Sequence, residues 1–323
     1  MKQWDKLNLV ISKCLGDSPC RYDGQKSPCS IVKELKPFAN IIEVCPEQEI
    51  GLPTPRESIR LLAENNSIKL IEPISKKDLT PLMSEFAEEF FTSLDLKNIT
   101  GFILKSRSPS CGLKDVKIYN STVKGASFEK GKGVFAEALY KKFPNAIIEE
   151  DGRIKNFSIR EHFLTRLFTL SSFKKAKNEN KFSSLLKFHT LNKLLFKSYN
   201  QVIQKTLGGL VANHEDLPLS KVFKLYEENL LRLMIKAPSY KRNINVLNHS
   251  LGYFEELPTK EKDFFYEILN KYRNGKVPLS VPKILLKSYA IRFSNNYLLS
   301  QTFLEPYPEE LMNLSDSGKG VVR

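Results

Sequence analysis

Residues 7–16 read Leu7-Asn8-Leu9-Val10-Ile11-Ser12-Lys13-Cys14-Leu15-Gly16, an apolar run of strand length that ends in a polar loop with a cysteine. Comparable short runs follow at residues 41–44, 68–71, 102–104, 116–119 and 146–148. Stretches of helical character separate several of them, at residues 55–65, 78–94 and 133–143. This alternation predicts an α/β domain with a mainly parallel sheet.

The pattern changes after Asp151. Apolar residues then recur at helical spacing, and from Phe182 to about Leu304 the chain is rich in Leu, Lys, Phe and Tyr at helical periods. Breaks are expected at Pro218, Pro238, Pro258, Pro278 and Pro282. We therefore expect a Rossmann-like α/β N-terminal domain followed by an all-α C-terminal domain.

The expected domain bounds are 1–155 for the first domain, 156–181 for a connecting helix and linker, 182–310 for a basic helical domain, and 311–323 for a tail. The stretch after Pro306 shows no core-like pattern, so we expect it to fray. A length of 323 residues agrees with two domains.

Composition is typical of a globular protein, because 41% of the residues are hydrophobic and 27% are charged. These values exclude a disordered, collagen-like or low-complexity chain. No apolar run approaches the roughly 18 residues that a membrane helix needs, and the first residues do not resemble a secretory signal. We expect a cytoplasmic protein with no membrane partner.

Charge is distributed unevenly along the chain. Residues 1–150 hold 22 Lys/Arg and 20 Asp/Glu, a net charge of +2, whereas residues 151–323 hold 28 and 16, a net charge of +12. A strongly basic half indicates nucleic acid or another anionic surface as partner. Solvated lysine faces remain the alternative interpretation.

Cysteine and histidine occupy different halves of the chain. All five cysteines lie in the first 111 residues, and all four histidines follow residue 160. Cytosolic cysteines are metal ligands, nucleophiles or inert core residues more often than disulfides. Without a nearby histidine, an all-thiolate site remains, which iron–sulfur clusters prefer.

Three of these cysteines follow predicted strands. Cys14, Cys45 and Cys111 come after the strands at 7–11, 41–44 and 102–104. Parallel sheets bind ligands beyond the carboxyl ends of their strands, so the three thiolates can converge if the strands are neighbours. Taken singly, each cysteine is also compatible with a small buried core residue.

Each of the three lies in a motif with Gly or Pro and a nearby charge. The motifs read Cys20-Arg21-Tyr22-Asp23-Gly24 after Cys14, Cys45-Pro46-Glu47 followed by Gly51-Leu52-Pro53-Thr54-Pro55-Arg56, and Leu104-Lys105-Ser106-Arg107-Ser108-Pro109-Ser110-Cys111-Gly112. Through them, residues 5–150 resemble the thiouracil desulfidase family. Through residues 188–193, 241–247, 252–254, 272–279 and 306–308, the second half resembles the YbgA-like helical domain fused to that family in many bacterial proteins.

The resemblance implies a 4Fe–4S cluster held by Cys14, Cys45 and Cys111, with one open iron that binds a thiocarbonyl sulfur as a soft Lewis acid. Water then replaces sulfur on the ring carbon without net electron transfer. Glu47 is the candidate general base, and Ser108, or less favourably Ser110, holds the water or the developing anion. A solvated carboxylate and a turn-forming hydroxyl are the alternatives for Glu47 and Ser108.

Other residues of the motifs have less definite roles. Arg21, Tyr22, Asp23 and Arg56 are expected to shape the pocket or meet a phosphate of the substrate, with structural ion pairing as the alternative. We expect Cys20 to lie behind the ligands or in the core, and to replace Cys14 if Cys14 is not a ligand. Cys29 has no assigned role, and the glycines of residues 125–133 do not have P-loop spacing.

The family's fused members imply tRNA as partner and 4-thiouridine as the thiolated pyrimidine substrate. A basic helical domain suits this role because it can hold the phosphate backbone while the base is unstacked. The expected RNA contacts are Lys193, Lys241, Arg242, Arg273, Lys283 and Lys287, whereas His189 is expected in the core. The alternatives are salvage of free thiouracil or thiouridine, with the helical domain serving oligomerisation, and a non-catalytic iron–sulfur RNA-binding or sensor protein.

Overall fold

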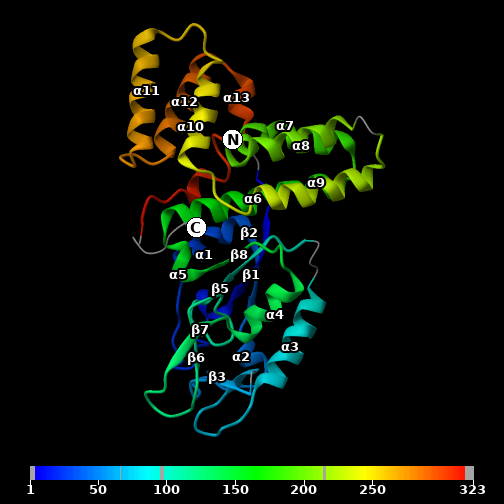
Figure 1. Ribbon diagram of the computed structural model, residues 1–323, viewed down its shortest axis with the longest axis vertical. Helices are drawn as coiled ribbons and strands as arrows, with labels where there is room; N and C mark the ends of the chain where they lie inside the picture. Colours follow the sequence, from blue (N-terminus) through cyan, green and yellow to red (C-terminus); the bar gives the residue numbers. More distant parts are fainter. Residues whose placement is uncertain (1–3, 66, 95–97, 214–215, 317–323) are drawn as a thin grey trace. The chain divides into compact units, whose positions relative to one another are not determined.

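The computed structural model describes residues 4–65, 67–94, 98–213 and 216–316 (Figure 1). Its described residues form two compact units. The first is drawn from Met1–Ser171 and Glu310–Val321, and the second from Ser172–Glu309. The first unit is α/β and the second is helical, as the sequence predicts. Among the described helices, none has the length and apolarity needed to cross a bilayer.

The first unit contains a fully parallel sheet with the strand order β2-β1-β5-β8. These strands span Ala39–Val44, Leu7–Ser12, Gly101–Leu104 and Ile148–Glu150. The central strand is β1, where Leu9 pairs with Ile41 of β2 and with Gly101 of β5. The chain passes from β1 to β2 on one side and later returns to β5 on the other. Such a reversal creates a ligand-binding crevice at the carboxyl ends of the strands.

A second sheet, with the order β4-β3-β6-β7, was not expected from the sequence. Its strands span Ser67–Ile71, Arg60–Glu64, Val116–Tyr119 and Phe128–Gly131. Two antiparallel hairpins, β3 with β4 and β6 with β7, join through the parallel pair β3 and β6. The helix expected at 55–65 was therefore wrong. Leu61 and Leu70 pair across the first hairpin and are both fully buried, and this pairing overrides the helical preference of the segment.

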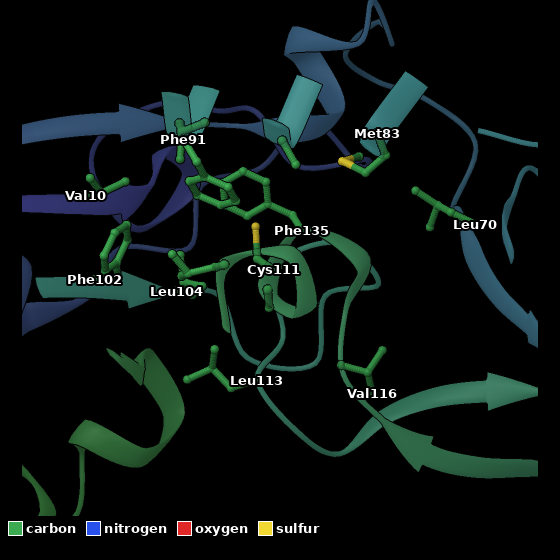
Figure 2. Packing of buried hydrophobic residues seen from close by; sticks show 14 of the residues in the cluster. Val10, Leu70, Met83, Phe91, Phe102, Leu104, Cys111, Leu113, Val116 and Phe135 are labelled. Atoms are coloured by element: carbon green, nitrogen blue, oxygen red, sulfur yellow. The ribbon is translucent and has the colours of Figure 1, made fainter. Parts of the chain in front are cut away.

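The core of the first unit lies between the parallel sheet and two helices, α3 (Thr80–Ser93) and α4 (Val134–Lys142). Figure 2 shows Val10, Phe102 and Leu104 of the sheet facing this cluster. Phe91 and Phe135 meet with ring centroids 4.8 Å apart. The shorter helices of the unit are η1 (Lys13–Leu15), α1 (Ser30–Leu35), η2 (Lys36–Phe38), α2 (Pro46–Glu49) and α5 (Asp151–Ile154).

The long helix α6 (Phe157–Glu179) runs from the first unit into the second. The helices that follow are α7 (Phe182–Tyr199), α8 (Gln201–Ala212), α9 (Leu219–Leu233), α10 (Tyr240–Leu251), α11 (Thr259–Arg273), α12 (Ser280–Arg292), α13 (Asn296–Ser300) and η3 (Glu309–Leu311). Pro218 and Pro258 immediately precede helices, as expected. Pro282 does not break a helix; it lies in the first turn of α12, where the backbone nitrogen needs no partner.

The core of the helical unit is aromatic. Phe173 of α6 stacks on Tyr226 of α9, with ring centroids 5.6 Å apart, and Phe188 of α7 packs against Phe173 at 5.5 Å. His189 is 7% exposed, and its Nδ1 lies 2.9 Å from the Tyr226 hydroxyl. The expectation that His189 is a core histidine is confirmed.

The expected fraying after Pro306 was wrong for the residues that the structure describes there. Tyr307 and Leu311 are 2% and 1% exposed. Arg160 of α6 also donates to the carbonyl oxygen of Ser315, at 2.6 Å. These anchoring residues are too widely spaced to form a periodic pattern, so the sequence did not reveal them. Residues 317–323 of the expected tail lie outside the described residues.

Candidate active site

The carboxyl ends of β1, β2 and β5 border a cavity of about 840 Å³. Cys14 lies in η1 directly after β1, Cys45 directly follows β2, and Cys111 lies in the loop after β5. All three line the cavity, and so does Cys20. The three strands are neighbours in the sheet, which is the arrangement that the convergence of these cysteines requires.

Cys20 connects the first two motifs through its thiol. A hydrogen bond with Cys14, together with burial, raises the pKa of Cys20 to about 11. Contact with Cys20 and burial likewise raise the pKa of the Cys45 thiol. Burial and the nearby Glu47 carboxylate raise the pKa of Cys111. The protein alone therefore disfavours thiolates here, and a bound thiophilic cation would supply the missing positive charge.

Glu47 lies in the first turn of α2 and is 9% exposed. Cys45 occupies the position before the helix and Pro46 its first position, which fixes Glu47 next to the cavity. Oε1 accepts a hydrogen bond from Ser110 Oγ at 2.5 Å, and Oε2 lies 3.4 Å from Cys45 Sγ and 3.9 Å from Arg56 Nη2. Glu47 is therefore a buried, oriented carboxylate and not a solvated surface group.

The hydroxyls of Ser110 and Ser108 form a hydrogen-bonded chain between Glu47 and the cavity. Ser108 Oγ accepts from the backbone nitrogens of Ser110 and Cys111, at 3.3 and 3.2 Å, and lies 2.9 Å from Ser110 Oγ. Ser108 Oγ also donates to Glu47 Oε1 at 3.4 Å, a long hydrogen bond that a molecule in the cavity can replace as the acceptor. Ser108 lines the cavity, whereas Ser110 is fully buried behind it.

The loop that carries these serines is held by two carboxylates that the sequence analysis missed. Glu150 accepts from the backbone nitrogen of Leu113 at 2.6 Å. Asp151 accepts from the backbone nitrogen of Ser106 and from Lys105 Nζ, both at 2.7 Å. Glu150 ends β8 and Asp151 directly follows it, and this position at the ligand-binding edge of the sheet was the available signal.

The start of α4 closes on the same loop. Val134 N donates to the carbonyl oxygen of Pro109, and Ala136 N donates to that of Ser110, both at 3.0 Å. A Cβ on Gly133 would lie 2.5 Å from the carbonyl carbon of Ser110. Only glycine therefore permits this approach, and Gly133 has a packing role rather than a nucleotide-binding one.

Three of the four residues expected to bind substrate lie at the cavity. Arg21, Tyr22 and Arg56 line the cavity, whereas Asp23 does not line it and pairs with Arg21 at 3.4 Å. Arg56 Nη1 donates to the carbonyl oxygen of Cys20 at 3.1 Å. Arg56 thus links the Cys20 loop to Glu47, which is the structural ion pairing considered as its alternative role.

Across residues 4–65, 67–94, 98–213 and 216–316, no three His, Cys, Asp or Glu side chains are arranged to hold a single metal ion. A cubane cluster imposes a different geometry, because each cysteine binds a separate iron atom at its own corner. Four thiols line this cavity, and thiolate sulfur is the ligand that such a cluster uses.

Comparison with known proteins agrees with this division into domains. Residues 9–151 match the model of the 2-thiouracil desulfurase family, and residues 193–308 match that of a protein of unknown function, DUF1722. The two matched parts are called the desulfurase domain and the DUF1722 domain below.

Two individual proteins are also similar. The uncharacterized protein YbgA of Escherichia coli strain K12 is 28% identical over 158 residues, which is 48% of this chain and 93% of YbgA. A solved structure of the [4Fe-4S]-dependent thiouracil desulfidase TudS is 27% identical, and the match covers 46% of this chain and 92% of that one with a TM-score of 0.35.

In the DUF1722 domain, the expected RNA contacts differ in their surroundings. Lys193, Lys241 and Arg273 are exposed on α7, α10 and α11. Arg242 donates to the carbonyl oxygen of Tyr199, and Lys283 is buried beside the Phe303 ring. Lys287 pairs with Glu305 and Glu309. As RNA contacts, all six remain predictions.

Proposed function

We propose that this protein is an iron–sulfur desulfidase that removes the sulfur of 4-thiouridine in tRNA and leaves uridine. The observation that carries the proposal is the convergence of Cys14, Cys45, Cys111 and Glu47 on one cavity of the desulfurase domain. The basic second half, with a net charge of +12, supports RNA as the molecule that bears the thiobase.

The cofactor that we propose is a 4Fe–4S cluster. Cys14, Cys45 and Cys111 would hold it, which leaves one iron without a protein ligand, and Cys20 would take the place of Cys14 if Cys14 does not bind. When bound, the cluster supplies a soft Lewis acid that polarises a thiocarbonyl group. The surrounding side chains then have to position a water molecule and move its protons.

Glu47 suits the role of general base for that water. Its carboxylate is held by Ser110 and Arg56, so it points in a fixed direction and needs no reorganisation when it accepts a proton. Ser108, at the cavity wall, donates to the water or to the oxygen that becomes negative as the water attacks. The water oxygen replaces sulfur on the ring carbon, and sulfur leaves with the water's two protons as hydrogen sulfide, so no electrons are exchanged.

A nucleotide within RNA is favoured over a free base by charge at the cavity. Arg107, Lys114 and Lys155 line it and are exposed, and in the described part of the chain none of them forms an ion pair with a carboxylate. Cations of this kind suit phosphate groups, which free thiouracil lacks. A base within tRNA must leave its stack to enter such a cavity.

The test compares substrates with protein purified and reconstituted without oxygen. The holoprotein should release sulfide from tRNA that contains 4-thiouridine, more efficiently than from free thiouracil. Release from the free base alone would show a salvage enzyme. Bound iron and sulfide with no release from any thiolated base would show a sensor or RNA-binding protein instead.

A further inference from the structure

Three aromatic side chains form a surface cluster on the DUF1722 domain. Tyr253, just after α10, is 43% exposed, and its ring centroid lies 5.5 Å from that of Tyr297 in α13, with the ring planes tilted by 34°. His249 of α10 meets the Tyr253 ring edge-on at 5.7 Å. The neighbouring rings fix the orientation of Tyr253 while much of its surface remains accessible to a ligand.

Positive charge lies next to this cluster. Lys193 and Lys197 are one turn apart on α7. Burial lowers the pKa of His249, and the charges of Lys197 and Lys193 lower it further. Burial and the charge of Lys193 also lower the pKa of Lys197. Neither lysine is ion-paired with any carboxylate in the residues that the structure describes. The charge beside the rings is therefore not neutralised by the protein.

The helices that form this surface carry no acidic residue. α7 and α10 pack against each other and contain only basic charged groups apart from histidine, namely Lys187, Lys193, Lys197, Lys241 and Arg242. By contrast, α11 carries Glu261, Asp263 and Glu267 among its lysines. The two helices beside the aromatic cluster are thus basic, while the turn that carries Tyr253 continues into the exposed Glu255 and Glu256.

We propose that Lys193, Lys197, His249, Tyr253 and Tyr297 form a binding site for single-stranded RNA. One unpaired base stacks against the Tyr253 and Tyr297 pair, and the adjoining phosphates lie against the two lysines. Aromatic rings beside a positive groove are the usual means by which proteins hold unpaired nucleotides, because every base has a stacking face. A duplex hides those faces, so the site takes a loop, bulge or end of the RNA.

This site deepens the proposed function, since it rests on RNA as the partner, but it needs neither the cluster nor a thiolated base. The experiment therefore uses unmodified tRNA and a short unstructured RNA, with binding to the full-length protein followed by fluorescence anisotropy over a range of salt concentrations. Loss of 4-thiouridine from tRNA is measured separately with the reconstituted holoprotein.

Replacement of the exposed ring provides the first comparison. Tyr253→Ala should weaken RNA binding roughly ten-fold, whereas Tyr253→Phe should bind as the wild type because stacking needs only the ring. The matched control is Tyr266→Ala, since Tyr266 is 48% exposed on α11, where Glu261, Asp263 and Glu267 offset the basic residues. Equal affinity of Tyr253→Ala and the wild type would overturn the site.

Replacement of the two lysines provides a second comparison that does not depend on how Tyr253→Ala folds. The double variant Lys193→Gln with Lys197→Gln should lower the slope of log affinity against log salt by about 1.4, from two single-strand phosphate contacts. Lys271→Gln, which removes a lysine paired with Glu267, should leave the slope unchanged. An unaltered slope in the double variant would also overturn the site.

The two proposals fail separately. RNA binding that depends on Tyr253 without any loss of 4-thiouridine would overturn the proposed enzymatic function and leave the binding site standing. Loss of 4-thiouridine together with unchanged RNA binding in Tyr253→Ala would overturn this site alone.

Discussion

Ser110 Oγ lies 2.5 Å from Glu47 Oε1, although 63 residues separate the two in the chain. The hydrogen bond joins α2, which follows β2, to the loop that follows β5. Ser110 Oγ also lies 3.6 Å from Cys111 Sγ. The orientation of the candidate base is therefore tied to the segment that carries one candidate cluster ligand, and disturbance of either should affect the other.

Replacement of Glu47 tests its role as base. Glu47→Gln keeps the shape of the side chain but cannot accept a proton, so desulfuration should fall by about 10²- to 10⁴-fold while iron binding is retained. Sulfide release and iron content of the same preparation measure the two effects. Glu49→Gln is the matched control, because Glu49 is exposed on the same short helix. Full activity of Glu47→Gln would remove Glu47 from the mechanism.

Replacement of single cysteines tests the ligand set. Cys14→Ser, Cys45→Ser and Cys111→Ser should each lose bound iron and acid-labile sulfide after reconstitution. Cys29→Ser should keep both, because Cys29 does not line the cavity. If Cys14→Ser retains its iron and Cys20→Ser loses it, then Cys20 is the third ligand in place of Cys14.

Gly133→Ala tests the close approach of α4 to the serine loop. The added methyl group collides with the Ser110 carbonyl, so the variant should lose about 1–3 kcal/mol of stability, as overpacked sites do. Thermal unfolding measures the change. Gly209→Ala is the control, since nothing lies within 4 Å of its Cβ in helix α8, and there alanine should stabilise by up to about 1 kcal/mol. Equal shifts in both variants would contradict the packing role.

The buried His189 predicts a pH dependence of stability. Burial, with a smaller effect of Lys193, lowers its pKa from 6.5 to about 4. Above pH 6.5 the imidazole is neutral in both the folded and unfolded states. Between pH 6.5 and 4 only the unfolded state takes up the proton, so stability should fall as pH falls, by up to about 3 kcal/mol near pH 4.

Urea unfolding of the wild type and of His189→Gln at pH 7 and pH 4.5 measures this contribution. The variant should lose less stability than the wild type over that interval because it has no titrating group at this position. His249→Gln is the comparison: burial and Lys197 also lower the pKa of His249, but at an exposed position, so this variant should lose more stability than His189→Gln over the same interval. The same pH dependence in His189→Gln and in the wild type would contradict the assignment.

Much of the parallel sheet was predictable because its strands are short, apolar and separated by helices. The cysteines after three strands predicted a common site on the condition that the strands are neighbours, and the order β2-β1-β5 meets that condition. The pairing of β3 with β4 was not predictable in this way. The segment Arg60–Glu64 has the composition of a helix and becomes a strand only because Ser67–Ile71 pairs with it.

The side-chain contacts within the site were harder to predict from the sequence. Glu47 could be named as a candidate base, but its contacts with Ser110 and Arg56 depend on how loops from different strands meet. Glu150 and Asp151 support the serine loop across about 40 residues of sequence, and no local pattern encodes that contact. Tyr253 and Tyr297 likewise become a pair only because the turn after α10 lies beside α13.

The most direct measurement is the amount of 4-thiouridine in tRNA before and after incubation with the reconstituted holoprotein. We predict that 4-thiouridine disappears, that uridine and sulfide appear in equal amounts, and that Glu47→Gln prevents the change. Unchanged 4-thiouridine in the presence of protein with a full complement of iron and sulfide would contradict the proposed function.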